Sequence, residues 1–328
     1  MENKRVLIIP DIPHWALDKN ARDLVKYNRS NLDLEICYFD DFKKDWRNYY
    51  QHFDLLYPMY KGLFFNFLKF KMPVDRVVTG IRSFYRWDHG KTVPPGYNSR
   101  PGHKIIRKLR KALLVNTHCK KLWYIFSHYL PVIHTKYTCD LEIFYPERKK
   151  QPDKNIVVGW TGSLTNHPNK RGFHEFIRPA CESISEIELR VQAKEDNFIT
   201  DDNKMREFYN SLDLYITASR CEGTPRPIIE AAACGVPVIT TDVGFVPELI
   251  ENGVHGFIVD RTLSAFTDKL TWIVDNREIL PLMGKAIHAK MEQEFNWKHL
   301  VFQWTDFFHY ALELNRLRTT GLIKRNDY

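Results

Sequence analysis

The sequence predicts an α/β protein with two doubly wound domains, each built on a parallel β-sheet. In the first half of the 328 residues, short apolar runs alternate with helical patterns, and a second alternation begins at Ile156. Strands that alternate with helices favour a parallel sheet whose two faces are covered. Residues 147–154, between the two alternations, are charged and contain a proline, which is typical of a linker.

The first predicted domain comprises residues 1–146. Its expected strands are short apolar runs, partly β-branched, at residues 6–9, 34–39, 55–57, 77–79, 113–115 and 132–133. Helical patterns lie at residues 15–27 and 119–129. The apolar and basic segment 63–71 is expected to cover the sheet, with a membrane contact as the alternative. Residues 82–103 contain two Pro-Gly pairs, so we expect a long loop that faces a cleft.

The second predicted domain comprises residues 155–296. Its expected elements are strands at 156–160, 188–191, 214–217 and 236–240, and helices near 173–183, 204–212, 228–234 and from 264 onward. Residues 297–328 form the last segment. It begins with an amphipathic pattern rich in Trp and Phe over residues 296–314, which predicts a helix packed against a core.

The chain is basic, with 48 Lys and Arg against 40 Asp and Glu, a net charge of +8 and a pI near 9.0. Much of the excess lies in residues 100–121 and 148–154. Such a balance favours anionic partners. Two interpretations remain open, an ordinary solvated surface or a peripheral contact with an anionic membrane. We expect no nucleic acid partner, because the sequence contains no recognised nucleic-acid-reading motif.

Targeting and cysteine patterns indicate the compartment. No run of 18 apolar residues occurs, so no membrane-spanning helix is predicted. The apolar run 6–9 is too short for the core of a signal peptide. The six cysteines contain no C-x-x-C pair, so buried thiols are expected rather than disulfides or a zinc site. We therefore expect a cytoplasmic protein, with peripheral association at the inner face of the membrane as an option.

The most informative segment is S-R-C-E-G-T-P-R-P-I-I-E-A-A-A-C-G, residues 219–235. It follows the apolar run 214–218 and leads into a small, apolar stretch, which predicts a strand, a tight loop and a helix. Glu222 then lies on the loop and Glu230 in the first two turns of the helix. Both carboxylates are expected at the carboxyl end of the strand, where open α/β sheets bind their ligands.

The start of this helix suits a nucleotide. Proline is favoured in the first helical turn, and Pro225 or Pro227 fits that position. The N–H groups around Thr224 and Arg226 then form an anion site suited to phosphate, with Arg226 as an added cation. Glu230 is placed to accept hydrogen bonds from a ribose diol, and Glu222 to meet the group beyond the phosphates. The alternative is that both glutamates merely stabilise the helix start.

The segment resembles the signature of retaining glycosyltransferases of the family 4 group, S-x-x-E-G-x-x-x-x-x-x-E-A-x-A-C-G-x-P-V-I. The chain continues this pattern through Ile239 and Gly244 to N-G-V-H-G-F at residues 252–257, and the likeness covers residues 156–257. The resemblance implies the GT-B fold, in which two Rossmann-like domains face each other across a cleft. It also implies an acceptor-binding first domain, a nucleotide-sugar-binding second domain and a C-terminal helix that crosses back to the first domain.

The resemblance implies transfer of a sugar from a nucleoside diphosphate sugar to a glycan, lipid-linked or similar acceptor, with retention of configuration, in surface polysaccharide or glycoconjugate synthesis. The expected catalytic residues are Glu222, Arg171 and Lys170, of which Arg171 matches the family's basic residue before a glycine. The expected donor-binding residues are Glu230, Gly223, Thr224, Pro225, Arg226, Gly162 and Ser163.

No metal cofactor is expected. The sequence has no D-x-D motif, and the adjacent pairs Asp40-Asp41 and Asp201-Asp202 place their side chains in divergent directions. Cations and a helix N-terminus would then have to neutralise the departing diphosphate. The chain departs from the family where Gly-Arg usually follows the first strand of the second domain, because residues 159–163 read G-W-T-G-S. Lys170 and Arg171 together, or Arg226, are expected to take over the missing arginine's task.

Two further functions remain open at this stage. A nucleotide-sugar epimerase on the same fold would alter the donor without an acceptor. A non-catalytic nucleotide-sugar-binding protein would bind the donor and show neither transfer nor slow hydrolysis.

Overall fold

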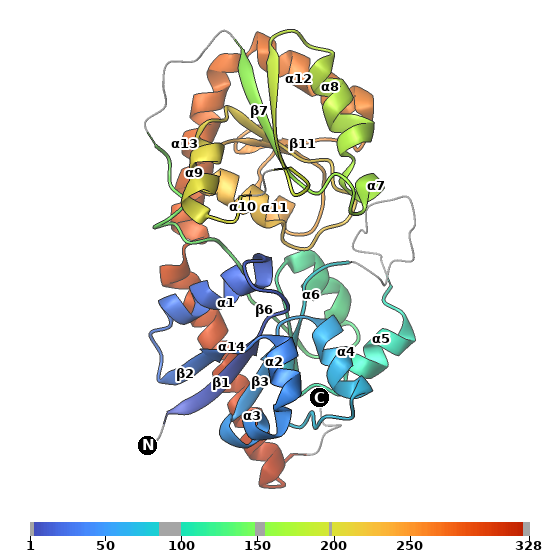
Figure 1. Ribbon diagram of the computed structural model, residues 1–328, viewed down its shortest axis with the longest axis vertical. Helices are drawn as coiled ribbons and strands as arrows, with labels where there is room; N and C mark the ends of the chain where they lie inside the picture. The colour runs from blue at the N-terminus through green and yellow to red at the C-terminus, as the bar shows by residue number, and fades with distance from the viewer. Residues whose placement is uncertain (1–2, 85–99, 148–154, 197–198, 324–328) are drawn as a thin grey trace. The chain divides into compact units, whose positions relative to one another are not determined.

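The chain forms two compact units in the computed structural model, which describes residues 3–84, 100–147, 155–196 and 199–323 (Figure 1). The first unit contains the described residues up to Tyr137 and returns at Trp297, and the second contains those from Thr138 to Asn296. Most of the predicted linker, residues 148–154, and residues 85–99 of the predicted long loop lie outside the described residues. Within the described part, no helix is long and apolar enough to cross a membrane.

The first unit is built on parallel strands in the order β2-β1-β3 and β4-β5-β6, and an isolated bridge between Leu56 and Val77 links the two sets. The strands are β1 Lys4–Ile9, β2 Leu32–Ile36, β3 Leu55–Pro58, β4 Val78–Ile81, β5 Leu114–Thr117 and β6 Val132–His134. The helices are α1 Ala16–Tyr27, α2 Phe39–Lys44, α3 Trp46–His52, α4 Lys61–Lys69, α5 His103–Leu109, α6 Lys120–Ser127 and α14 Trp297–Thr319.

Helix α14 supplies part of the core of the first unit. The rings of Trp304, Phe307 and Phe308 surround Tyr57 of β3 edge-on, with ring centroids 6.0, 6.0 and 5.5 Å away. The indole N–H of Trp304 donates to the carbonyl of Lys136, 2.9 Å away, so its one polar atom is satisfied. The aromatic face that the sequence predicts for this helix is therefore buried against the sheet of the first unit.

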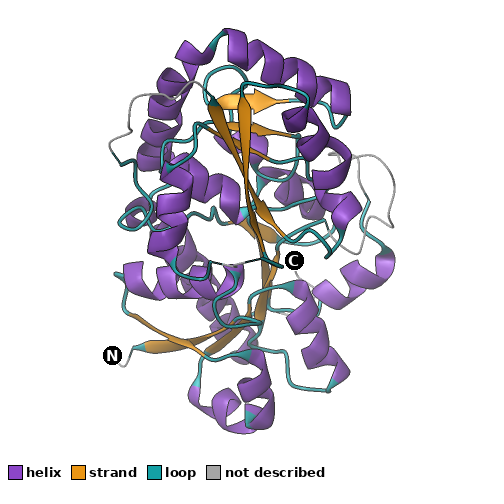
Figure 2. Cartoon of the chain, turned by 45° about the horizontal axis from the view of Figure 1, so that its top comes forward, coloured by secondary structure: helices purple, strands orange, loops and turns teal. Residues whose placement is uncertain are grey.

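The second unit is a five-stranded parallel sheet in the order β11-β10-β9-β7-β8, with helices on both faces (Figure 2). The strands are β7 Ile156–Gly162, β8 Ile187–Ala193, β9 Leu214–Ile216, β10 Val238–Thr240 and β11 Gly256–Ile258. The helices are α7 Pro168–Arg171, a π-helical turn Phe173–Ile177, α8 Arg178–Glu182, α9 Asp202–Asn210, α10 Arg226–Ala233, α11 Val246–Leu249, α12 Leu263–Asp275, a 3-10 turn Arg277–Ile279 and α13 Leu280–Glu294.

The strand order of the second unit fixes where a ligand can bind. The chain starts in β7, places β8 on one side, and then builds β9, β10 and β11 on the other side. Helices α8 and α12 pack together, while α10 packs with α9 and α13, so successive crossovers use different faces. The strand order thus reverses between β7 and β9, and doubly wound sheets bind their ligands at the carboxyl ends of the strands at such a reversal.

The predicted α/β class, with parallel sheets, is confirmed. Several boundaries differ from the prediction. Phe39 was expected in a strand but begins α2, where its buried ring packs on Phe67, and the Phe67 ring in turn stacks on Phe42. Strand β11 was not predicted. The six cysteines are all buried as thiols, as expected.

We predict that Trp304→Ala lowers the free energy of unfolding of the first unit by about 3–5 kcal/mol, because it removes a fully buried indole from the core. Chemical denaturation followed by circular dichroism measures the change. Phe302→Ala on the same helix is the matched control, because the Phe302 ring is 56% exposed. Equal losses in the two variants would show that α14 is not part of this core.

Candidate functional site

The loops after β7 and β9 meet at the point where the strand order reverses. The backbone N–H of Arg220, after β9, donates to the carbonyl of Lys170 in α7, 2.8 Å away. Gly172 ends α7 with a left-handed φ of 68°, and a Cβ there would lie 2.8 Å from the carbonyl oxygen of Ala218. The two segments that the sequence singles out are thus adjacent at the carboxyl edge of one sheet.

A third loop, after β10, holds the segment around Glu222 in place. The N–H of Phe245 donates to the carbonyl of Gly223 at 2.9 Å, and the hydroxyl of Thr241 donates to the carbonyl of Ser219 at 2.5 Å. Gly244 has a φ of 51°, and a Cβ at this position would lie only 1.8 Å from the Gly223 oxygen. Only glycine allows this close approach, which sets the position of the peptide next to Glu222.

Glu230 is buried in α10 within a compact polar cluster. Its Oε1 accepts a hydrogen bond from Nε of Arg226 at 2.5 Å, one helical turn earlier, and its Oε2 accepts from the hydroxyl of Tyr209 at 2.9 Å. The Arg226 and Glu230 side chains are each 6% exposed. Burial, followed by the charge of Glu230, raises the pKa of Tyr209 well above its usual value, so Tyr209 remains a donor.

In this cluster Arg226 has a partner that the sequence did not predict. The sequence offered its guanidinium as a cation for phosphate, but the structure directs its Nε to Glu230. A carboxylate has about four lone-pair sites, of which Nε of Arg226 and the Tyr209 hydroxyl take two. Glu230 therefore keeps acceptor capacity for hydroxyl donors, and its two partners fix the orientation of the carboxylate.

Glu222 and Thr224 lie on the loop before α10, which begins after Pro225 at Arg226 with Pro227 in its first turn. Glu222 is half-buried and accepts a hydrogen bond from the Ser219 hydroxyl at 3.2 Å. The hydroxyl oxygen of Thr224 is buried and has no hydrogen-bond partner among the described residues. A buried hydroxyl without a partner is unfavourable, so this oxygen is a natural contact for a bound polar group.

Arg171 is directed toward the end of β7. Its Nη1 would lie 3.1 Å from a Cβ at Gly162, and its Nε is buried without a partner among the described groups. Lys170 precedes it at the end of α7 and is partly buried. These observations bring Arg171 and Gly162 together, as the sequence suggests, and leave a guanidinium donor for an anion.

Arg261 is a site residue that sequence reasoning missed. Its Nε donates to the carbonyl of Ala218 at 2.8 Å and its Nη2 to the carbonyl of Asn169 at 2.5 Å, so it connects the loops after β7 and β9. Glu175 approaches the same guanidinium at 3.6 Å. Burial lowers the pKa of Arg261. The sequence shows only a lone arginine after β11, which gives no signal for this bridging position.

Ser163 has a partner that was also missed. Its hydroxyl donates to Glu195 Oε1 at 2.5 Å, and the same carboxylate accepts from the N–H groups of Leu164 at 2.9 Å and Thr165 at 3.2 Å. These hydrogen bonds, with that from the Ser163 hydroxyl as the largest cause, hold the pKa of Glu195 far below its usual range. The Ser163 hydroxyl therefore anchors the loop after β7 to the loop after β8.

Comparison with known proteins identifies this unit. Residues 179–289, which include the whole segment from Ser219 to Gly235, match the family described as glycosyl transferases group 1. These residues, which make up about a third of the chain, are therefore similar to the group 1 glycosyltransferases. The predicted resemblance to glycosyltransferases is confirmed over these residues.

Curated relatives match parts of the chain. The capsular polysaccharide biosynthesis glycosyltransferase CapM of Staphylococcus aureus is 24% identical over 180 residues, covering 47% of each chain. The lipopolysaccharide core biosynthesis mannosyltransferase LpsB of Rhizobium meliloti is 35% identical over 101 residues, covering 30% of this chain and 29% of LpsB. The matches span less than half the length of these relatives.

Solved structures match nearly the whole chain. Sucrose-phosphate synthase of Thermosynechococcus elongatus has a TM-score of 0.75 at 12% identity and covers 94% of this chain and 99% of its own. HepE of Anabaena in complex with UDP and glucose has a TM-score of 0.69 at 14% identity and covers 93% and 99%. The fold is therefore that of the GT-B glycosyltransferases, as the sequence resemblance implied.

We predict that Gly244→Ala destabilises the second unit by more than Gly253→Ala. Both glycines have left-handed φ angles, 51° and 85°, so alanine costs about 1–2 kcal/mol of backbone strain at each. At Gly244 the new methyl group also meets the Gly223 carbonyl, whereas nothing lies within 4 Å at Gly253. Chemical denaturation of the two variants measures the difference, and equal losses would contradict the close approach.

Proposed function

We propose that this protein is a retaining, metal-independent glycosyltransferase that moves a sugar from a nucleoside diphosphate sugar to a glycan or lipid-linked acceptor. The observation that carries the proposal is the placement of Glu222 and Glu230 at the reversal point of a doubly wound sheet, within a segment that matches the group 1 family. CapM and LpsB are named for capsule and lipopolysaccharide synthesis, which supports a role in surface polysaccharide or glycoconjugate synthesis.

The donor is held by the second unit in this proposal. Glu230, oriented by Arg226 and Tyr209, accepts hydrogen bonds from the ribose hydroxyls. The hydroxyl of Thr224 and the backbone at Gly223 and Pro225 lie at the start of α10, where partial positive charge favours phosphate. HepE, which shares the fold, has been solved with UDP and glucose, and this supports a nucleoside diphosphate sugar as the donor.

Transfer breaks the bond between the anomeric carbon and the diphosphate oxygen, so negative charge grows on the diphosphate. The unpartnered Nε of Arg171 and the ammonium of Lys170 are the proposed cations for that charge. One preorganised donor of this kind is typically worth about 3–4 kcal/mol of the barrier. Glu222 contacts hydroxyls of the transferred sugar and stabilises the positive charge that develops on its ring. Gly162 has no side chain, so the backbone at the end of β7 can approach the phosphates.

We further propose that the protein acts in the cytoplasm and associates peripherally with the inner face of the membrane. The net charge of +8 favours an anionic surface, and a lipid-linked acceptor would be presented there. The first unit is the proposed acceptor-binding unit.

We predict that Glu230→Gln weakens donor binding about tenfold or more, because a charged acceptor of two hydrogen bonds becomes a neutral amide. Glu222→Gln is expected to lower turnover about a hundredfold or more while donor affinity changes little. Isothermal titration with UDP-glucose and a transfer assay measure the two effects. Glu182→Gln is the control, since this side chain is 67% exposed. Full transfer activity in Glu222→Gln would refute its catalytic role.

We also predict that a chelator leaves the transfer rate unchanged and that added magnesium or manganese does not raise it. The physical reason is that Lys170, Arg171 and the start of α10 supply the positive charge. A rate lost on adding EDTA and regained with a divalent cation would overturn the metal-independent mechanism. Product analysis in the same assay separates transfer from epimerisation, which would change the donor sugar without acceptor.

A further inference from the structure

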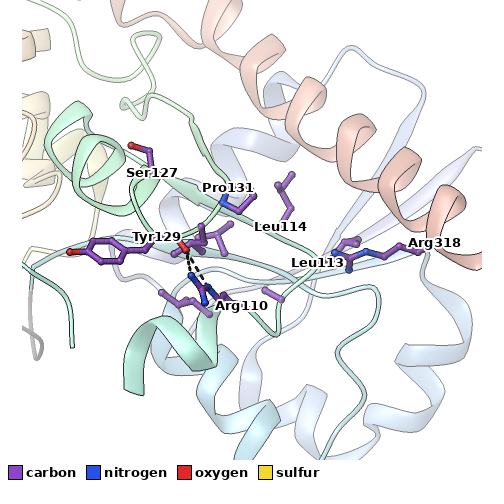
Figure 3. Close-up of a pocket in the computed structure, with 11 residues that line it drawn as sticks. Arg110, Leu113, Leu114, Ser127, Tyr129, Pro131 and Arg318 are labelled. Atoms are coloured by element: carbon purple, nitrogen blue, oxygen red, sulfur yellow. Dashed lines mark hydrogen bonds between the residues drawn. The ribbon is translucent and has the colours of Figure 1, made fainter. Parts of the chain in front are cut away.

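A hollow of about 670 Å³ lies in the first unit, at the amino end of β5 (Figure 3). Its apolar lining includes Leu109, Leu113 and Leu130, and two arginines, Arg110 and Arg318, complete it. Strand β5 continues from here to Thr117, so the hollow opens at the opposite end of this strand from its carboxyl end. Ligands of doubly wound sheets bind at the carboxyl ends, and this hollow is therefore a separate feature.

The surroundings of the hollow carry the excess charge of the whole chain. Residues 100–139 contain nine Lys or Arg and no Asp or Glu, so the remainder of the chain is close to neutral. On and just after α5, the side chains of Lys104, Arg107, Lys108 and Lys111 are exposed. A single-sign cluster of this size creates a field that attracts anionic surfaces.

The two arginines give the hollow a chemical preference. Arg110 donates from Nε and Nη2 to the carbonyl of Tyr129, at 3.2 and 2.8 Å, and forms no ion pair with a carboxylate among the described residues (Figure 3). Arg318 of α14 lines another part of the same hollow (Figure 3). Guanidinium groups bind phosphate through paired hydrogen bonds. Arginines above an apolar lining therefore suit a phosphate that is attached to an apolar group.

Exposed aromatic side chains next to the hollow point to a membrane as the source of that phosphate. Trp123 and Tyr124 lie on α6, whose end contributes Ser127 to the lining, and they are 41% and 46% exposed. Leu322, just beyond α14, is 67% exposed. Trp and Tyr are favoured at the membrane–water interface, because each combines an apolar ring with a polar atom. A free phosphate would need none of these apolar groups.

We propose that this hollow binds the phosphate group of an anionic membrane phospholipid and thereby attaches the first unit to the bilayer. Arg110 and Arg318 hold the phosphate, and the leucines contact the glycerol and the first part of the acyl chains. The exposed lysines and arginines of α5 add attraction to neighbouring headgroups. This proposal makes the proposed peripheral membrane contact specific, and it holds whether or not the second unit transfers a sugar.

The test compares two double variants of the full chain that lose the same charge. Arg110→Gln with Arg318→Gln is expected to lower the partition onto phosphatidylcholine vesicles containing phosphatidylglycerol about tenfold or more, in co-sedimentation. Arg29→Gln with Arg47→Gln removes two exposed arginines elsewhere in the first unit. This control pair is expected to change the partition onto vesicles far less. Equal losses would show a diffuse basic attraction and overturn the proposal.

Binding of a soluble lipid distinguishes a specific lipid-binding site from general attraction to a charged membrane surface. Dihexanoyl phosphatidylglycerol below its micelle concentration is expected to bind the native chain and the control pair, and to lose binding in the Arg110/Arg318 pair. Displacement by inorganic phosphate at equal concentration would instead indicate a free-phosphate site and overturn the membrane assignment.

The Arg110→Lys, Arg318→Lys pair keeps the charge and controls for a folding defect, since its vesicle binding should remain above that of the glutamine pair. UDP-glucose binding, measured on the same samples, reports separately on the second unit.

Discussion

The reversal of strand order between β7 and β9 is the constraint on which the second unit depends. Because β8 is added on one side of β7 and β9 on the other, the loops that follow β7 and β9 lie at the point of reversal, where doubly wound sheets bind their ligands. Every residue considered for donor binding or catalysis lies at the end of β7, on these two loops or on the helices that they begin. Arg261 and Gly244 matter because they hold these loops at fixed separations, through hydrogen bonds to Ala218 and Asn169 and through contact with Gly223.

The buried pair of Arg226 and Glu230 has an energetic cost that needs a reason. Two charges that are each 6% exposed lose most of their hydration, and such a pair often contributes little net stability compared with apolar residues of the same size. Removing one partner alone typically costs about 3–5 kcal/mol, since the other charge stays buried. A pair that gives modest stability yet orients a carboxylate with spare lone pairs is best explained by preorganisation for a ligand.

The sequence allowed the architecture to be predicted better than the contacts. Alternating apolar runs predicted parallel sheets and the start of the long aromatic helix, because these features depend on local periodicity. Glu222 and Glu230 could be located because they belong to one contiguous segment. Arg261 and Glu195 could not, since each acts on loops 30 to 92 residues away in the sequence. The contact of Arg226 with Glu230 could not be predicted either, because a sequence shows the charge of an arginine and not the carboxylate that its Nε contacts.

The net charge of a sequence likewise does not show which part of the structure carries the excess. A positive net charge suggests at first that the charge of the chain serves the proposed nucleotide donor. The segment that carries Glu222 and Glu230 also carries Arg220 and Arg226, so its own acidic and basic residues balance. The excess resides instead in residues 100–139, around α5, β5 and α6 of the first unit, where an apolar hollow and exposed aromatic rings accompany it. Two anion-binding demands are thus met by different means. In the two proposals, the start of α10 and a few buried donors serve a single diphosphate, and a broad field of exposed cations serves an extended anionic surface.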